Sequence, residues 1–193
     1  MISCYKLYCL IGMSGSGKST IEKMLEENGI KRIISYTTRP MREGEVEGRD
    51  YYYVTEEEFN KLDLIENTEY RKWHYGMKKQ DVDLSKSNCV CVIEPHGYRQ
   101  IKNAIGNDAI GILLKVNDRD RLIRVLQREL EPDIEEIWRR FNSDKNLFYG
   151  MDLEVDYIYN DMHSTKIAND IIKLAQKNKS YEQQKKEFFN RYA

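Results

Sequence analysis

A glycine-rich octapeptide near the start of the chain constrains its fold most. Gly12-Met-Ser-Gly-Ser-Gly-Lys18-Ser19 fits the pattern G-x-x-x-x-G-K-S/T. The apolar run Tyr5–Ile11 precedes it and the helical pattern Lys18–Asn28 follows it. Glycines let main-chain N–H groups turn inward around a phosphate, and the positive end of the next helix adds to the attraction. This order of strand, glycine loop and helix predicts a triphosphate site on an α/β fold.

The side chains of this loop have separate predicted roles. Lys18 would bridge the β- and γ-phosphates as a mobile charge, and Ser19 would offer its hydroxyl to Mg²⁺. Magnesium is the only metal inferred, held mainly by ATP oxygens, Ser19 and waters, because the histidines show no ligand spacing. The motif alone does not separate a kinase from an ATPase or a GTPase. The predicted nucleotide-binding residues are Gly12, Met13, Ser14, Gly15, Ser16, Gly17, Lys18, Ser19 and Thr20.

Strand and helix patterns alternate along most of the chain. Asn88–Ile93 and Ile110–Val116 indicate buried strands, and each precedes a helical pattern. This alternation predicts βαβ units and a parallel sheet. A β-rich stretch near 36–75 interrupts the alternation and predicts a small second lobe, which begins with an irregular loop over 36–50. A single domain, 1–193, is predicted, with a core (about 1–34, 80–120 and 150–178), a second lobe (about 35–79), a lid (about 121–149) and a tail (179–193).

The charge balance gives no basis for a partner that the overall charge of the protein would attract. Lys plus Arg number 31 and Asp plus Glu 32, so the formal net charge is -1. Neither nucleic acid nor a membrane surface is therefore expected to bind. No apolar run approaches the ~18 residues of a membrane span, and none of the four cysteines forms a C-x-x-C pair. Thiols packed as small hydrophobes predict a cytoplasmic protein, whose oligomeric state the sequence does not give.

Residues 35–51 hold candidates for a second anion site. Arg39 and Arg42 lie three apart across Pro40, which stiffens the turn. Two guanidinium forks can chelate one phosphate, and a kinase needs such a site for its acceptor. A solvated charged loop is the alternative interpretation, and composition alone favours it.

The pattern of this stretch extends beyond the two arginines. It is S-x-T-T-R-x-x-R-x-G-E-x-x-G-x-D-Y, and after a P-loop it resembles the guanylate kinase family. Its residues here are Ser35, Thr37, Thr38, Arg39, Arg42, Gly44, Glu45, Gly48, Asp50 and Tyr51. The resemblance spans roughly residues 6–175, through Leu64-Ile-Glu66, Tyr75-Gly76, Glu94, Gly97, Ile137-Trp-Arg139-Arg140 and Asp156-Tyr-Ile-Tyr-Asn160-Asp161.

The resemblance implies a fold and an activity. The implied fold is a three-layer α/β P-loop kinase fold with a mostly parallel central sheet, a small β-rich monophosphate-binding subdomain and a helical lid. The implied activity is transfer of the γ-phosphoryl group of ATP to GMP or dGMP. ATP and GMP would then be the small-molecule partners.

The resemblance also assigns roles in acceptor binding. The positions that bind the acceptor's phosphate are matched by Arg39, Arg42, Tyr51 and Tyr75. Two forks supply charge there, and two phenols donate hydrogen bonds. Ser35 and Glu66 fall on positions that read guanine, whose N1–H and N2 amino group one carboxylate can accept together. Glu94 is a further candidate acid for the substrate site, near the metal.

Two departures from the family pattern concern the base. Where the family usually has Ser or Thr after Tyr75-Gly76, this chain has Met77. Where the family commonly has two acids separated by one residue, this chain has Val92 and Glu94. One base contact and one carboxylate are therefore missing, which leaves dGMP or another nucleotide open as the acceptor.

Arginines mark the two predicted lid helices. Arg121, Arg124 and Arg128 lie at i, i+3 and i+7, so they should share one helix face, with Glu129–Asp133 joining the helices. Positioned arginines stabilise the charge of a phosphoryl group in transfer. Arg139 and Arg140 should point in different directions, so that at most one faces the phosphates. Exposed arginines paired with neighbouring acids are the alternative. By the resemblance, the predicted catalytic residues are Lys18, Arg128, Arg140 and Arg124.

Two other functions remain as alternatives. One is a kinase of the same fold with a different acceptor, such as another nucleoside monophosphate or a sugar phosphate, and Met77 keeps it open. The other is a guanylate kinase-like binding module without catalysis. Such modules usually have a degraded P-loop, so the intact Gly17-Lys18-Ser19 argues against it.

Overall fold

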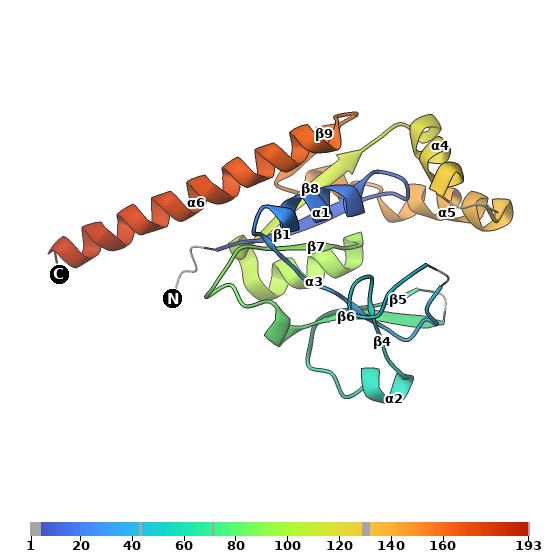
Figure 1. The fold of residues 1–193 in the computed structure, drawn as a ribbon, viewed down its shortest axis with the longest axis horizontal. Coiled ribbons are helices and arrows are strands. Elements are labelled where there is room, and N and C mark those ends of the chain that lie inside the picture. The colour runs from blue at the N-terminus through green and yellow to red at the C-terminus, as the bar shows by residue number, and fades with distance from the viewer. Residues whose placement is uncertain (1–4, 43, 71, 129–131, 193) are drawn as a thin grey trace.

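Two β-sheets and the helices around them make up the described part of the molecule (Figure 1). The computed structural model describes residues 5–42, 44–70, 72–128 and 132–192, with side chains except at Arg128 and 179–192. None of the helices within these ranges combines the length and apolar character of a membrane span.

Five parallel strands form the central sheet, in the order β2-β7-β1-β8-β9. They are β1 (Leu7–Gly12), β2 (Lys31–Arg32), β7 (Cys89–Val92), β8 (Ala109–Lys115) and β9 (Tyr157–Asn160). The central strand β1 is buried over all six residues. Burial on both faces requires a nearly continuous apolar sequence, as the residues before the glycine loop provide. The glycine loop directly follows the carboxyl end of β1.

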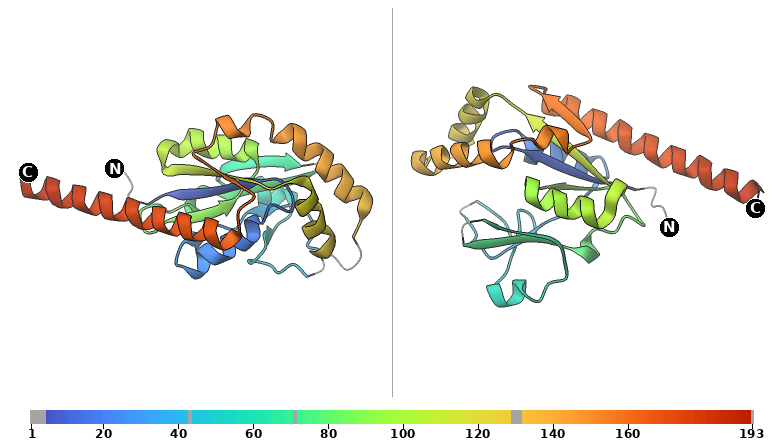
Figure 2. Two further views of the ribbon diagram at one scale, coloured as in Figure 1. Left: turned by 90° about the horizontal axis from the view of Figure 1, so that it is seen from above. Right: turned by 180° about the vertical axis from the view of Figure 1, so that it is seen from behind.

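Helices cover both faces of this sheet (Figure 2). Tyr8 and Leu10 face a core shared with α1 (Lys18–Glu27) and α6 (Ser164–Tyr192). Leu7, Cys9 and Ile11 face the opposite core, shared with α3 (Pro95–Ile105). The predicted three-layer α/β fold with a mostly parallel central sheet is therefore confirmed. Short 3-10 turns are η1 (Lys79–Asp81), η2 (Gly106–Asp108) and η3 (Met151–Leu153).

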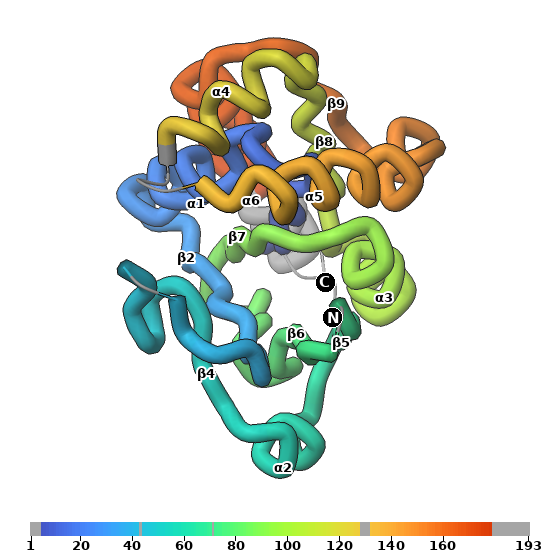
Figure 3. The backbone as a smooth tube through the Cα atoms, turned by 90° about the vertical axis from the view of Figure 1, so that its right-hand side faces the viewer, coloured from blue at the N-terminus to red at the C-terminus, as the bar shows by residue number. Residues whose placement is uncertain are grey.

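A second sheet of four strands, with α2 (Glu56–Phe59), forms a small lobe over residues 36–78. Its order is β4-β3-β6-β5, comprising β3 (Tyr36–Thr37), β4 (Tyr52–Tyr53), β5 (Leu64–Tyr70) and β6 (Trp73–Lys78). A capping box at Thr55, reciprocated by Glu58, begins α2. Figure 3 shows this lobe below the core, with α4 (Asp118–Arg128) and α5 (Ile134–Leu147) above it. We refer to α4 and α5 as the lid helices.

The structure corrects several predicted elements. The loop predicted over 36–50 is wrong at its start, because Tyr36–Thr37 pairs with both β4 and β6. Strand β6 was not predicted: its sequence, WHYGMK, has no clean alternation, and only Gly76 and Met77 are fully buried. Helix α6 continues to Tyr192, through most of the predicted tail (179–193), because this polar segment is rich in good helix formers. The joining residues 129–131 of the predicted lid lie outside the described ranges.

Candidate active site

The glycine loop between β1 and α1 has the backbone of an anion cradle. Gly15 and Gly17 have left-handed φ angles of 78° and 93°, which residues with a Cβ rarely adopt. The Lys18 ammonium donates to Met13 O at 3.1 Å and to Gly12 O. Ser16 Oγ is buried and lacks a hydrogen-bond partner among the described residues. Left-handed glycines, a helix N-terminus and this unsatisfied hydroxyl fit a bound triphosphate.

The candidate metal ligand stands beside the cradle. Ser19 occupies the first turn of α1 and is exposed to solvent, where a hydroxyl is free to join a hydrated cation. Thr20 follows it and is also exposed. One hydroxyl ligand suits Mg²⁺, which keeps several waters and takes its other ligands from the phosphates.

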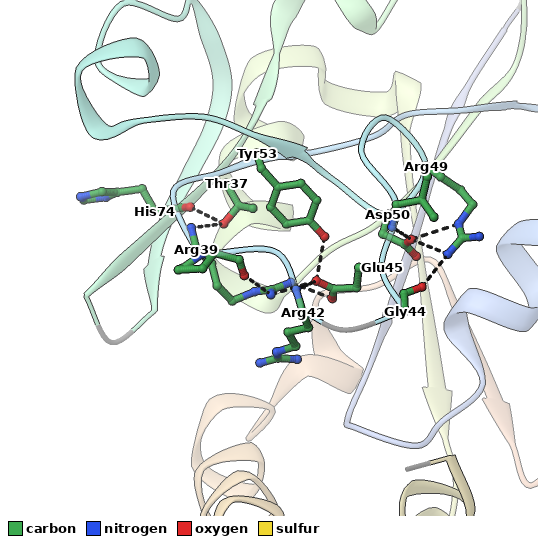
Figure 4. A network of polar contacts seen from close by, with 11 residues as sticks. Thr37, Arg39, Arg42, Gly44, Glu45, Arg49, Asp50, Tyr53 and His74 are labelled. Carbon is green, nitrogen blue, oxygen red and sulfur yellow. Dashed lines mark hydrogen bonds and ion pairs between the residues drawn. The ribbon is translucent and has the colours of Figure 1, made fainter. Parts of the chain in front are cut away.

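Arg39 forms the centre of a polar cluster in the small lobe (Figure 4). Its side chain is only 7% exposed and grips Glu45 through two hydrogen bonds, of 3.0 Å (Nη1–Oε2) and 2.8 Å (Nη2–Oε1). Tyr53 OH donates to the same carboxylate at 2.7 Å. Burial acts to raise the pKa of Glu45, but hydrogen bonds from Arg39, the Arg42 N–H and Tyr53 outweigh it and lower the pKa to about 2. Glu45 therefore stays charged and holds the fork in place.

The predicted tyrosines lie against this fork. The guanidinium carbon of Arg39 is 5.4 Å from the centre of the Tyr51 ring, and the Tyr51 and Tyr75 rings are 5.8 Å apart. Burial raises the pKa of Tyr51 to about 12, so its phenol remains a hydrogen-bond donor. Arg42 contributes its main-chain N–H to Glu45 at 2.8 Å, while its exposed side chain points away from the pair (Figure 4).

Glu45 and Tyr53 are functional candidates to which the sequence reasoning gave no role. Glu45 is part of the quoted motif, but nothing in the motif indicates that it clamps Arg39. Tyr53 lies two residues after Tyr51, and the centres of the two rings are 6.0 Å apart. That spacing was the available signal for a second ring beside the fork.

Glu66 lies on β5, and its side chain is almost fully buried. Its side chain is 5% exposed, and its cross-strand neighbour is the fully buried Met77. Burial and the charge of Glu94 raise the pKa of Glu66 to about 7. A Cβ at Gly97 would lie 2.7 Å from Glu66 Oε2, so only glycine leaves room for this carboxylate. Met77 is thus a core residue, packed with the apolar side chains beneath α3.

Glu94 lies between the two candidate sites. It precedes α3 as its N-cap residue and is exposed to solvent. Partial burial raises its pKa, the Lys18 ammonium opposes that rise, and Asp144 adds to it. The charge of Glu94 also raises the pKa of Glu66. One carboxylate therefore interacts electrostatically with both Glu66 and Lys18. Ser35, the other predicted base reader, is half-buried, and its carbonyl accepts a hydrogen bond from Tyr52 N at 3.0 Å.

Arg121, Arg124 and Arg128 of α4 were predicted to share one helix face, and the two of them whose side chains the structure describes both reach the phosphate loop. Arg121 is 1% exposed and lies beneath the phosphate loop, where its Nε donates to Ser14 O at 3.0 Å. Arg124 is exposed, and its Nη1 reaches Gly15 O at 3.4 Å. Helical spacing alone does not reveal that Arg121 is buried while Arg124 is exposed. The side chain of Arg128 lies outside the described residues.

The two arginines of α5 converge on Glu136, contrary to their predicted divergence. Arg139 Nε donates to Glu136 Oε2 at 2.8 Å, and Arg140 Nε donates to Glu136 Oε1 at 2.9 Å. Arg139 also donates to Tyr70 OH, and its guanidinium lies 5.4 Å from the centre of that ring. Because Tyr70 ends β5, this contact joins a lid helix directly to the small lobe.

Three features define a P-loop nucleoside monophosphate kinase. They are a three-layer α/β core with a P-loop, a β-rich lobe that carries an arginine–tyrosine cluster, and a pair of lid helices. Comparison with known proteins agrees: the guanylate kinase family matches residues 4–183. The chain belongs to the guanylate kinase family.

Individual relatives support this assignment. The chain is 34% identical over 178 residues to a guanylate kinase of Fusobacterium nucleatum, covering 87% of this chain and 94% of that protein. It is 34% identical over 119 residues to a guanylate kinase of Rhodopseudomonas palustris, spanning only 53% of that protein's length. The crystal structure of guanylate kinase from Anaplasma phagocytophilum shares the fold, with a TM-score of 0.70, 24% identity and coverage of 93% of this chain and 88% of that one.

Proposed function

We propose that this chain transfers the γ-phosphoryl group of ATP to GMP or dGMP in the cytoplasm, giving ADP and GDP or dGDP. The observation that carries the proposal is the position of Glu66: its carboxylate lies against Gly97 in the first turn of α3, and α3 follows β7, the parallel neighbour of the strand β1 that leads into the phosphate loop. An acceptor base held at Glu66 would therefore lie near the triphosphate. A hydrolase has no use for the second site.

The proposed step is an in-line displacement. An oxygen of the acceptor phosphate bonds to the γ-phosphorus as the bond from that phosphorus to the β–γ bridging oxygen breaks. Lys18 and the loop amides stabilise the charge on ATP, and Arg39, Arg42, Tyr51 and Tyr75 orient the acceptor. Mg²⁺, held by Ser19 and ATP, supplies further neutralisation of phosphate charge when bound. Arg124, Arg128 and Arg140 are the proposed lid arginines.

The base pocket favours guanine. Guanine presents N1–H and the N2 amino group side by side, and a carboxylate accepts from both. Adenine has no such pair of donors, and its binding would leave the buried Glu66 without a match. Met77 supplies no polar group beside Glu66, so base recognition here depends on Glu66 and Ser35.

A Glu66→Gln variant tests this role. We expect the KM for GMP to rise about 10–100-fold, because the amide presents a donor where guanine also presents one. The KM for ATP should stay within twofold. Glu69→Gln, at an exposed position of the same strand, is the matched control. Equal effects on both substrates would contradict a base-reading role.

The same residue predicts a pH dependence. The Glu66 pKa of about 7 lies above that of an ordinary glutamate, so the carboxylate that accepts from guanine is populated above pH 7 and lost below it. We expect kcat/KM for GMP to fall nearly tenfold per pH unit below about pH 6.5 in the wild type. Glu66→Gln should lose this component, and an identical profile in both proteins would contradict the assignment.

An ATP-consumption assay over the common nucleoside monophosphates tests the proposal as a whole. GMP and dGMP should support turnover, AMP, CMP and UMP should not, and ATP hydrolysis without acceptor should stay low. If only another monophosphate or a sugar phosphate supports turnover, that compound, and not GMP, is the acceptor. Binding without turnover of any acceptor would indicate a binding module.

A further inference from the structure

Both lid helices hold the outer side of the phosphate loop. The main-chain N–H of Ser14 donates to Asp144 Oδ2 of α5 at 2.9 Å, and the Ser14 carbonyl accepts from Arg121 Nε of α4 at 3.0 Å. Arg121 Nη2 closes the ring, 3.4 Å from the same Asp144 oxygen. One peptide segment is thus held by two oppositely charged side chains from two different helices.

This ring is buried and closely packed. Arg121 is 1% exposed, and the side chain of Asp144 is 13% exposed. The guanidinium carbon lies 4.4 Å from the centre of the Phe141 ring, and Arg121 Nη1 is 3.3 Å from Asp118 Oδ1. A Cβ at Gly15 would stand 2.5 Å from Arg121 O, so the loop also lies directly on the backbone of α4. The loop cannot shift here without breaking several contacts.

Stability alone gives little reason for such a pair. A buried ion pair often contributes no more than well-packed apolar residues would, because both charges lose their hydration. What this pair adds is a fixed geometry for Ser14, the third residue of the loop, which directly precedes the left-handed Gly15. A loop fixed before ATP arrives loses less conformational freedom on binding, and preorganised amides act more strongly on phosphate charge.

We propose that Arg121 and Asp144 are positioning residues, which fix the phosphate loop for ATP by tying Ser14 to both lid helices. The inference rests on the proposed function for its catalytic consequence, but its binding consequence can be measured separately.

The test compares Arg121→Met, Asp144→Ala and the double variant by thermal unfolding, MgATP titration and steady-state kinetics. Each single change leaves a buried charge without its partner and should lower the midpoint of thermal unfolding by about 10 °C. The double variant should recover most of that loss. We expect it nevertheless to bind MgATP about tenfold more weakly than wild type, with a raised KM for ATP and an unchanged KM for GMP. The control is Arg99→Met with Glu154→Gln, which removes a two-bond ion pair between exposed side chains.

A purely structural pair would give the opposite pattern. The double variant would then recover MgATP affinity together with its unfolding midpoint, and the proposal would be overturned. Arg121→Lys keeps the charge but lacks the fork that reaches Ser14 and Asp144 at once. It should raise the Kd for MgATP about threefold or more, and an unchanged Kd would also overturn the proposal. A wild type that binds MgATP without phosphorylating GMP would refute the proposed function, yet these affinities would still decide the positioning role.

Discussion

Replacing Lys18 with alanine is expected to lower kcat for phosphoryl transfer by about 10³-fold while the protein stays folded. The ammonium is the one mobile charge that the loop can bring to the β- and γ-phosphates, and loss of a group that acts on transition-state charge has effects of this size. In the structure it is half-buried and donates to Gly12 O and Met13 O, at the mouth of the loop rather than in a core. Initial rates at saturating ATP and GMP, with a thermal unfolding curve, measure both effects.

The control for this variant lies on the same helix. Lys23 is exposed, and its ammonium lies 4.0 Å from Glu27 Oε1, so Lys23→Ala should keep wild-type rates. Substantial turnover by Lys18→Ala would count against the phosphate assignment of the loop. A comparable loss in both variants would point to a defect of α1 instead.

The second large effect is expected at Arg39. Arg39→Met should raise the KM for GMP about 100-fold, because it removes charge-assisted hydrogen bonds to the acceptor phosphate. The KM for ATP should stay within twofold, since Arg39 belongs to the small lobe whereas the phosphate loop belongs to the core. Steady-state kinetics with each substrate varied in turn give the two values.

Arg39→Met also leaves the Glu45 carboxylate without its fork, so its stability must be measured alongside. Arg49→Met is the control, because Arg49 pairs with Asp50 in the same loop but is exposed. A parallel rise in both KM values, or an Arg39→Met variant with unchanged KM for GMP, would contradict the acceptor-phosphate assignment.

Features encoded locally were predictable from the sequence. The phosphate loop needs eight contiguous residues, and its flanking strand and helix follow from hydrophobic periodicity. The capping box at Thr55 is likewise complete within four residues. The acceptor-phosphate residues needed the family resemblance, because a charged loop and an anion site have the same composition. Their assignments remain predictions until the variants above are measured.

Features that depend on distant partners were not predictable. The sequence separates Ser14 from Asp144 by 130 residues, and nothing near either residue indicates their hydrogen bond. Helical spacing placed Arg121 on one face with Arg124 and Arg128, but nothing in the sequence indicates that Arg121 is buried against Ser14. The strand β3 is only two residues long, too short for periodicity to show, and forms because β4 and β6 flank it.

The contact between Arg139 and Tyr70 connects the lid helix α5 to the small lobe. Widening the gap between α5 and the small lobe must separate this pair, and Glu136 binds both Arg139 and Arg140. The same movement therefore reaches an arginine proposed to act on the transferred phosphoryl group. Opening of the lid and displacement of the small lobe should therefore occur together.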